Sequence, residues 1–374
     1  MKKVLFVATV TGHINRFHLP YLELFKKKGW KTYVATGDDI PVDNFCDKKI
    51  KVPISRSPYK INNLKATKQL RKIIEKEHFD IIHCHTPMGS VVARLAAKKA
   101  RKNGTRVIYT AHGFHFYTGA PLINWLLFYP VEWYLAKYTD TLITINHEDY
   151  NRAKKKFSKR CHDIQYVPGV GIDPKKFDFK ITKQEKHELR ASLGLKDDDF
   201  VMIFPARLDK NKNQSLIIDA MAKIKNNKIH LLLPGKDEVN GIYQKYTKSL
   251  GLNNHVHFLG RRDDVPKLLH ISDIAISSSL REGLGLNVIE AIASGIPVIA
   301  VRNRGHNEII NSKNGTLINN SAEELSQAIS LYYNDIDNWY NYKKTSTESI
   351  NKFYLKNVVK RMAYIYRLNR KKER

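Results

Sequence analysis

Cysteine is scarce in this sequence, with Cys46, Cys84 and Cys161 as the three examples among 374 residues. Their number is odd and their spacing matches no zinc motif, so the sequence indicates neither a disulfide framework nor a cysteine-ligated metal. Scattered thiols of this kind are typical of a reducing compartment. We therefore expect a cytoplasmic protein.

Long apolar runs are also missing, since no stretch of 18 apolar residues occurs. The nearest candidate, residues 121–138, is interrupted by Asn124, Pro130, Glu132 and Lys137, and it should not span a bilayer. The start, MKKVLFVATVTGH, has too short an apolar run for a signal peptide and lacks a small-residue cleavage site. We expect neither a transmembrane helix nor a signal peptide.

Acidic residues are few, with 36 Asp and Glu against 64 Lys and Arg and a formal net charge of +28. The imbalance is uneven: residues 1–180 hold 33 basic and 15 acidic residues, residues 181–351 hold 22 and 20, and residues 352–374 hold nine and one. Such a field favours a phosphate-rich partner, either anionic lipid headgroups or nucleic acid. A solvated basic face is the alternative interpretation.

What is present is a regular alternation of short β-branched runs and amphipathic stretches over a length that favours two domains. A polar loop, TGHINRF, follows the first run, and a polar, charged connector over about 174–198 separates the two halves. The alternation predicts an α/β fold with two doubly wound Rossmann-like domains facing each other across a cleft, with ligands beyond the carboxyl ends of the strands. The predicted strands are 3–9, 31–36, 79–85, 106–110, 140–145 and 164–168 in the first half, and 200–206, 228–235, 255–260, 273–279 and 296–301 in the second.

Two glutamates surround a glycine-dotted turn in REGLGLNVIE, residues 281–290. Gly283 and Gly285 allow a tight turn, and a helix is predicted to begin near Leu286 or Asn287, where free N–H groups favour an anion. A carboxylate beside an anion site is repulsive unless it faces hydroxyl groups of the same ligand. A nucleotide sugar has that layout, with hydroxyl groups on both sides of a diphosphate. A loop glutamate and a helix-face glutamate without a ligand are the alternative.

Two cations lie in FPARLDKNKN, residues 204–213, at the end of the first strand of the same domain. Arg207 and Lys212 are predicted to lie at the same sheet edge as the glutamates, where they would hold a diphosphate and stabilise it as it leaves. A solvated basic loop is the alternative for this segment taken alone.

With these two segments together, the sequence resembles the family 4 retaining glycosyltransferases of the two-domain B fold, of the capsule and exopolysaccharide type. The family's Glu–seven residues–Glu element matches Glu282 and Glu290, and its G-R-(x)4-K loop matches Arg207 and Lys212, with Ala206 in place of the usual glycine. The strand signal A-x-G-x-P-V is matched by Ala293, Gly295, Pro297 and Val298.

The resemblance implies roles for residues of the second domain. Glu282 would contact the donor sugar and Glu290 the ribose, while Arg207 and Lys212 hold the leaving diphosphate. Backbone atoms near Arg261 would read the nucleobase. The N–H groups around Gly285, Leu286, Asn287 and Val288 would hold phosphate, and Gly283 would also belong to the donor-binding residues.

For the first domain, the resemblance implies an acceptor site with Gly12 under the donor and His112 near the transferring sugar. The stretch 11–20 lacks G-x-G-x-x-G, which counts against a dinucleotide cofactor. The resemblance also implies domains at 1–175 and 176–345, with a basic helix at 346–374 that returns to the first domain.

The family needs no bound metal, so we expect no cofactor. HCH (83–85) and HGFH (112–115) offer imidazoles for a metal, but no H-E-x-x-H is present. The acidic runs at 38–39, 197–199 and 335–337 are predicted to be solvated surface rather than metal-binding D-x-D motifs.

The implied reaction moves a sugar from an α-linked nucleoside diphosphate with retention. UDP is the commonest donor nucleotide in such families, and N-acetylhexosamine is one open choice of sugar. The expected acceptor is a polyprenyl-diphosphate-linked saccharide. The apolar, aromatic stretch 118–138 with its basic flanks favours docking on the inner membrane leaflet, so we expect a peripheral protein on the cytoplasmic face. A helix buried against its own sheet is the alternative.

Two rival functions remain at this point. A sugar-nucleotide epimerase or a phosphorylase would share the fold, but a phosphorylase needs a pyridoxal-phosphate lysine and a longer chain. A nucleic-acid-binding protein would suit the net charge, but no RNA- or DNA-binding signature is present, and the excess charge avoids the second domain. We therefore expect no nucleic acid partner.

Overall fold

The computed structural model describes residues 1–335 and 347–368. The chain forms two compact units, Met1–Gly171 with Lys356–Arg374, and Ile172–Leu355. The chain passes between units at 171 and 355 rather than at the predicted 175 and 346. The reason is local: Ile172 accepts a hydrogen bond from Leu355 N–H at 2.7 Å and donates one to Phe353 at 3.0 Å, so both crossing segments are tied together within the second unit.

The first unit contains a seven-stranded parallel sheet in the order β3-β2-β1-β4-β5-β6-β7. The runs predicted as strands form it, because β-branched residues buried on both faces suit a parallel sheet. The edge strand β3 lies in a segment where no strand was predicted. The strands are β1 (Lys3–Val7), β2 (Lys31–Thr36), β3 (Lys48–Lys51), β4 (Ile81–Cys84), β5 (Arg106–Ala111), β6 (Thr141–Thr144) and β7 (Asp163–Tyr166).

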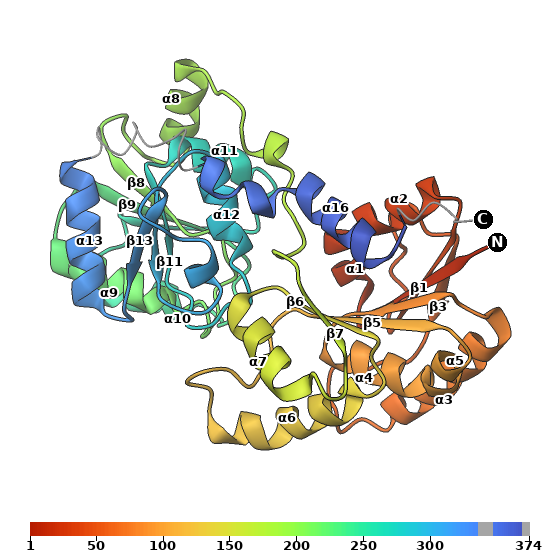
Figure 1. Ribbon diagram of the computed structural model, residues 1–374. Coiled ribbons are helices and arrows are strands. Elements are labelled where there is room, and N and C mark those ends of the chain that lie inside the picture. The colour runs from red at the N-terminus through yellow and green to blue at the C-terminus, as the bar shows by residue number, and fades with distance from the viewer. Residues whose placement is uncertain (336–346, 369–374) are drawn as a thin grey trace. The chain divides into compact units, whose positions relative to one another are not determined.

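Helices cover both faces of this sheet (Figure 1). One core holds side chains of α3 (Asn62–Glu77), α4 (Pro87–Ala96), α6 (Leu122–Ala136) and α7 (His147–Phe157). The other core holds side chains of α1 (Thr11–Phe17), α2 (Leu19–Lys27) and α16 (Leu355–Ile365). A short helix, α5 (Lys98–Lys102), follows α4.

The segment predicted as a polar loop, TGHINRF, is the helix α1. Its Ile14 is fully buried, and the backbone N–H of Thr11 donates to the carboxylate of Asp38 at 3.0 Å. The sequence prediction was wrong here because one buried residue and a distant carboxylate stabilise a helix that its own polar composition does not indicate.

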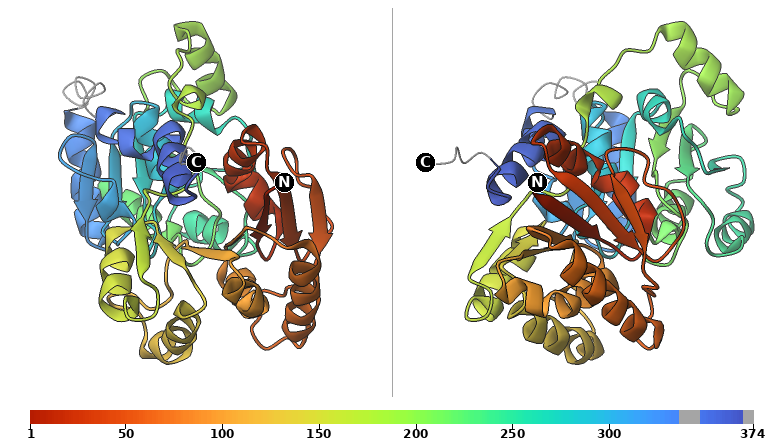
Figure 2. Two further views of the ribbon diagram at one scale, coloured as in Figure 1. Left: turned by 45° about the vertical axis from the view of Figure 1, so that its right-hand side comes forward. Right: turned by 90° about the vertical axis from the view of Figure 1, so that its right-hand side faces the viewer.

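The helix α16 packs beside α1 and α2, as the two views of Figure 2 also show. Val358, Met362 and Tyr366 are buried in that core. The hydroxyl of Tyr366 lies 2.7 Å from Nδ1 of His83 on β4. Of the basic helix predicted at 346–374, residues 346 and 369–374 lie outside the described residues.

The second unit contains a six-stranded parallel sheet in the order β10-β9-β8-β11-β12-β13. The strands are β8 (Phe200–Ile203), β9 (Ile229–Pro234), β10 (Val256–Gly260), β11 (Ile274–Ser277), β12 (Val298–Val301) and β13 (Gly315–Ile318). The helices are α8 (Lys183–Ser192), α9 (Gln214–Ile224), α10 (Ile242–Ser249), α11 (Val265–Ile271), α12 (Leu286–Ala293) and α13 (Ala322–Asn334). The fold class predicted from the alternation is confirmed.

The connector predicted at 174–198 is more ordered than its composition indicates. Thr182 and Glu185 form a capping box that begins α8. The buried Arg190 of that helix donates to the carbonyl of Ile271 at 2.7 Å and to the carboxylate of Asp273 at 3.1 Å. The helix is therefore part of the second unit's packing.

Candidate functional site

In the second unit, the predicted donor residues follow strands that meet at the carboxyl edge of one sheet. From β8 the chain passes first to β9 on one side and later to β11 on the other, so the strand order reverses between β8 and β11. Ligands of doubly wound sheets bind at such a switch point. Arg207 and Lys212 follow β8, and Glu282 follows β11.

Lys212 and Glu282 form an ion pair at this switch point. The ammonium nitrogen of Lys212 lies 2.5 Å from Oε1 of Glu282, and each side chain is 17% exposed. The two loops are tied together by their backbones as well. Ser278 donates its hydroxyl to the carbonyl of Lys212 at 2.7 Å, and Asn211 donates its amide to the carbonyl of Arg281 at 3.0 Å. The cation and the carboxylate are thus held on a rigid base.

Arg207 lies on the outer part of the same loop. It pairs with Glu238 at 2.9 Å and with Asp209 at 3.3 Å, and its side chain is 59% exposed. Its guanidinium can leave these surface pairs at small cost, since exposed ion pairs contribute about 0–1 kcal/mol. Arg207 is therefore able to turn towards an anion bound near Lys212.

The helix α12 begins at Leu286, within the predicted range, directly after Gly285 at φ 82°. A side chain at position 285 would be strained, and its Cβ would also lie 3.0 Å from the ring of His306. The backbone N–H of Val288 donates to the carbonyl of Gly285 at 3.1 Å, so the predicted phosphate contact of Val288 does not fit this geometry. The helix leaves the N–H groups of Leu286 and Asn287 to a ligand.

Gly283 precedes this helix start in the loop after β11, and Glu290 lies one turn inside the helix. Glu290 is partly buried. The two glutamates therefore lie on either side of the helix N-terminus. Contact of the two glutamates with hydroxyl groups on both sides of a phosphate stays a prediction.

Three residues after β12 complete the site, and the sequence analysis missed them. A Cβ on Gly305 would lie 2.8 Å from Cβ of Glu282, so Gly305 supports that glutamate closely. Arg304 donates to the carbonyl of Glu282 at 3.3 Å. His306 is buried, its Nδ1 lies 2.6 Å from the carbonyl of Val301, and burial lowers its pKa. The strand end followed by NRGH was the available signal.

Arg261 follows β10, two strands away from β8 in the sheet. Its exposed side chain lies 3.8 Å from the carboxylate of Asp263. Gly260, at φ 63°, accepts a hydrogen bond from the N–H of Gly235 at 2.7 Å, which fixes the turn before Arg261. Contact of this turn with a nucleobase stays a prediction.

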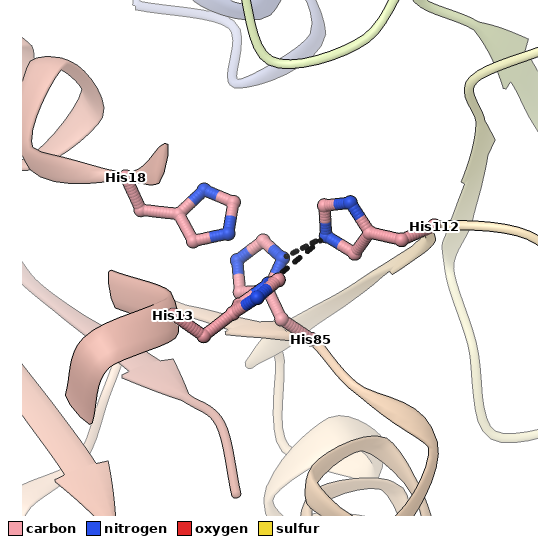
Figure 3. Close-up of side chains that lie close together, drawn as sticks. All are labelled: His13, His18, His85 and His112. Atoms are coloured by element: carbon pink, nitrogen blue, oxygen red, sulfur yellow. Dashed lines mark hydrogen bonds between the residues drawn. The ribbon is translucent and has the colours of Figure 1, made fainter. Parts of the chain in front are cut away.

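The first unit gathers histidines at its own switch point, which lies between β1 and β4. His13 and His18 come from the segment after β1, His85 directly follows β4, and His112 follows β5 (Figure 3). Nε2 of His112 lies 3.3 Å from Nε2 of His13 and 3.4 Å from Nδ1 of His85. His18 stacks on His85 with ring centroids 3.7 Å apart. Gly12 lies in α1, next to His13, and a Cβ on it would meet no described atom within 4 Å beyond its chain neighbours and the backbone of α1.

These four imidazoles are uncharged near neutral pH because burial opposes protonation. Burial lowers the pKa of His13 to about 4 and lowers the pKa values of His18, His85 and His112 well below their usual range. Neighbouring imidazoles add to the effect for the last three.

The histidines of the HCH and HGFH motifs do not all converge. Nδ1 of His83 contacts the hydroxyl of Tyr366 at 2.7 Å and its Nε2 contacts the hydroxyl of Thr110 at 2.8 Å, so both ring nitrogens are used in the core. His115 stacks on Phe128 of α6 with centroids 4.5 Å apart. Of these motifs, only His85 and His112 reach the cluster.

The acidic runs have structural partners in the described part of the chain. Asp38 holds the start of α1, and Asp39 pairs with Lys51. Asp197 contacts His187 at 2.7 Å, and Asp198 pairs with Lys228 at 2.7 Å. The run at 335–337 extends beyond the described residues.

Two family models match the chain over most of its length. The model described as glycosyl transferase 4-like matches residues 3–146, and the model described as glycosyl transferases group 1 matches residues 185–348. The second match contains Arg207, Lys212, Glu282 and Glu290.

Individual proteins agree with the family models. A Bacillus subtilis (strain 168) protein provisionally named glycosyltransferase EpsD is 45% identical over 85% of this chain and 83% of its own length. The Escherichia coli UDP-Gal:alpha-D-GlcNAc-diphosphoundecaprenol alpha-1,3-galactosyltransferase is 28% identical over 88% of this chain and 83% of its own length. The crystal structure of Anabaena HepE in complex with UDP and glucose shares the fold, with a TM-score of 0.80, 21% identity, and coverage of 98% of this chain and 100% of HepE. The chain therefore belongs to the family 4 glycosyltransferases of the B fold.

Proposed function

We propose that this glycosyltransferase moves a sugar from a nucleoside-diphosphate sugar, with retention of configuration, to a lipid-diphosphate-linked saccharide during surface polysaccharide assembly. The observation that carries the proposal is the Lys212–Glu282 pair at the β8/β11 switch point, 2.5 Å apart and next to the N-terminus of α12. One ligand satisfies both partners of this pair if it offers phosphate to the lysine and hydroxyl groups to the glutamate.

The charges of the site suit departure of a diphosphate. As the bond between the sugar and the phosphate breaks, negative charge grows on the phosphate oxygen. Lys212, Arg207 and the N–H groups of Leu286 and Asn287 would stabilise that charge. The departing oxygen would accept the proton of the acceptor hydroxyl, and no step of the transfer requires a metal. Glu282 would orient the sugar and Glu290 the ribose.

UDP is the donor nucleotide that we propose, with an N-acetylhexosamine as one candidate sugar. Support comes from the Escherichia coli relative, whose name specifies UDP-Gal, and from the fold shared with HepE, which binds UDP and glucose.

Thermal unfolding with UDP, GDP and ADP tests the donor site. A ligand that binds only the folded state stabilises it, by about 2.7 kcal/mol at 100 times its Kd. We expect UDP to raise the melting temperature of the wild type and of Glu323→Ala, a matched control on the exposed face of α13, but not of Glu290→Ala. Equal stabilisation of Glu290→Ala would remove the ribose contact from the proposal.

For the acceptor, we propose a polyprenyl-diphosphate-linked saccharide reached at the inner membrane leaflet. The name of the Escherichia coli relative specifies a diphosphoundecaprenol-linked acceptor. The helix α6 supports a membrane contact. It packs Trp125, Phe128 and Tyr129 against the core, and it also carries exposed apolar residues, including Leu122 at 80% and Leu126 at 71% exposure. Cations lie around it: Arg160 lies over the ring of Trp133.

Among the described residues, no helix has the length and apolar character that crossing a membrane requires. An apolar helix surface flanked by cations suits peripheral binding to anionic lipid instead. The protein would then be cytoplasmic and act on the cytoplasmic face of the membrane.

Flotation with vesicles of anionic lipid tests this contact. We expect salt-sensitive binding of the wild type and of Leu331→Asp, which changes an exposed leucine on α13. Leu126→Asp should weaken binding, because it places a carboxylate on the apolar surface of α6. Equal flotation of both variants would exclude α6 as the membrane contact.

A further inference from the structure

The four-histidine cluster of the first unit, His13, His18, His85 and His112, has an unusual density of ring nitrogens. One ring nitrogen of each histidine lies within 4.8 Å of one ring nitrogen of each of the others. Figure 3 shows the rings approaching one another from four separate points of the backbone. The family resemblance assigns a role near the transferring sugar only to His112 of this set, so the convergence of the other three needs its own explanation.

Hydrogen bonding among the rings does not satisfy them. An imidazole nitrogen carries either one proton or one in-plane lone pair, so it makes one good hydrogen bond. Nε2 of His112 has two imidazole neighbours, at 3.3 and 3.4 Å, and therefore serves only one of them well. Both ring nitrogens of His18 and Nε2 of His85 are buried, and within the described residues 1–335 and 347–368 they have no hydrogen-bond partner. Buried polar groups without partners are costly, by about 1–3 kcal/mol each.

The exposure of the rings fits an ion that enters from one side. His18 is 1% exposed and His85 is fully buried, whereas His13 and His112 are partly exposed. The partly exposed pair would form the entrance and the buried pair the floor of the site.

The distances fit a small cation with nitrogen ligands. At a zinc–nitrogen distance of about 2.0–2.1 Å, a tetrahedral site separates its ligand nitrogens by about 3.3 Å. The two nitrogen pairs around His112, at 3.3 and 3.4 Å, already have this separation. The wider pairs, up to 4.8 Å, need side-chain movements of the order of 1 Å.

We propose that His13, His18, His85 and His112 form a binding site for one divalent transition-metal ion, with Zn²⁺ as the preferred ion. Imidazole nitrogens without carboxylates or thiolates suit Zn²⁺, Ni²⁺, Cu²⁺ and Co²⁺ and do not suit Mg²⁺ or Ca²⁺. The uncharged state that burial imposes on these rings is also the state that binds metal.

The site differs from a structural zinc site in its surroundings. In structural sites the second ring nitrogen of each ligand usually donates to a carboxylate or carbonyl, and loss of such a partner costs about 10–100-fold in affinity. The second nitrogen of His18 has no such partner in the part of the chain that the structure describes. The bound ion is therefore exchangeable, and the proposed transfer proceeds without it.

Occupancy of the site has a consequence that rests on the proposed function. His112 cannot hold a metal and face the transferring sugar with the same nitrogen, so metal binding inhibits transfer reversibly. This adds a metal-dependent control to an enzyme for which the sequence indicated no metal.

The test is titration of the full chain, prepared without a histidine tag and freed of metal with a chelator. Co²⁺ bound by four imidazoles gives visible ligand-field absorption, and Zn²⁺ should displace it because Zn²⁺ binds nitrogen ligands more tightly. We expect one Co²⁺ per chain in the wild type. His18→Gln and, as a second variant at a partly exposed position, His13→Gln should lower Co²⁺ affinity at least about tenfold.

Two controls separate this cluster from other histidines. His78→Asn changes an exposed histidine with positive φ, which asparagine tolerates, and His257→Gln changes the histidine group of the second unit. Both should bind Co²⁺ like the wild type. Unchanged Co²⁺ binding by His18→Gln and His13→Gln would overturn the site. A second result would also overturn the site. If the wild type gives no Co²⁺ signal but is stabilised by inorganic pyrophosphate, and His18→Gln loses that stabilisation, the cluster binds anions.

Failure of the site and failure of the proposed function give different results. Stabilisation by UDP depends on the second unit and does not require Co²⁺ binding, and the Co²⁺ spectrum does not require transfer. Zn²⁺ should slow transfer by the wild type at least about tenfold and leave the residual transfer by His13→Gln unchanged. Bound Zn²⁺ without slower transfer would overturn the inhibitory role alone.

Discussion

The two units place polar side chains at the same point of similar sheets, but they stabilise them by opposite means. In the first unit, four histidines lie at the β1/β4 switch point and are kept uncharged by burial. In the second unit, Lys212 and Glu282 lie at the β8/β11 switch point and keep their charges by pairing at 2.5 Å. Sheet topology therefore determines where a site forms, and the local residues determine whether it binds through lone pairs or through charge.

This difference also separates the ligands that each site can accept. A charged pair next to a helix N-terminus suits a phosphate with hydroxyl neighbours. Buried neutral imidazoles have lone pairs to offer to a cation and little positive charge to offer to an anion. Four experiments test this difference between the two switch points, and the change with the greatest expected consequence comes first.

Removal of the cation at the second switch point should have the largest effect. Lys212→Met leaves Glu282 without its partner and removes stabilisation of the leaving diphosphate, so we expect transfer to slow by roughly 10²–10³-fold. Initial rates with donor and acceptor measure this. Lys210→Met, an exposed lysine of the same loop, should keep the wild-type rate. If Lys212→Met lowers the transfer rate by less than tenfold, transfer does not depend on the charge of Lys212.

A methyl group at Gly235 should displace the loop after β8 that holds Arg207. A Cβ on Gly235 would lie 1.8 Å from the carbonyl oxygen of Ala206, next to Arg207. The backbone has to move, and we expect Gly235→Ala to lower the free energy of unfolding by about 1–3 kcal/mol. Urea unfolding measures the loss, and weaker stabilisation by UDP should accompany it. An unchanged urea midpoint would mean that the backbone of the loop after β8 can shift at little cost in stability.

The same substitution at the first switch point should spare the fold. Apart from its chain neighbours and the backbone of α1, no described atom lies within 4 Å of the position that a methyl group on Gly12 would occupy, and alanine favours the helix there. If a donor approaches the backbone there, Gly12→Ala should keep the melting temperature and slow transfer by about tenfold, which corresponds to about 1.4 kcal/mol. Wild-type rates in a stable Gly12→Ala protein would remove Gly12 from the donor site.

Acidification should reveal uncharged histidines in the second unit as well. Burial, followed by the neighbouring His230 and His255, lowers the pKa of His257 to about 4, while Asp199 opposes the shift. The folded state therefore favours neutral His257: this contribution is fully present above the unfolded pKa of about 6.5 and is lost as pH falls towards 4.

His257→Gln should make the free energy of unfolding less dependent on pH between about 6.5 and 4. At pH 5 we expect the contribution of His257 to have fallen by less than about 2 kcal/mol, because partial exposure weakens the effect. Urea unfolding of the second unit is measured by hydrogen exchange at pH 7 and at pH 5, for the variant and for the wild type. An identical loss of stability in both proteins would contradict the assigned pKa.

Local patterns accounted for much of the fold and for part of the donor site. The β-branched runs predicted eleven of the strands as segments, and the glycines before Leu286 predicted the start of α12. Such features depend on residues close together in the chain. The edge strands β3 and β13 and the helix α8 were not predicted. The two strands depend on pairing with β2 and β12, and α8 depends on distant partners of Arg190 such as Ile271 and Asp273.

The alternation of strands and helices, the basic character of the first half and the residue types at each strand end can be read from the sequence. Which strand ends meet depends on the tertiary fold. Because β4 pairs with β1 across 77 residues of chain, His85 joins His13 and His18 while His83, two residues earlier, turns to Tyr366. In the same way, Gly305 reaches Glu282 only because β12 pairs with β11. Strand periodicity is a local property, whereas strand order depends on the burial of whole helix faces, and no short motif records it.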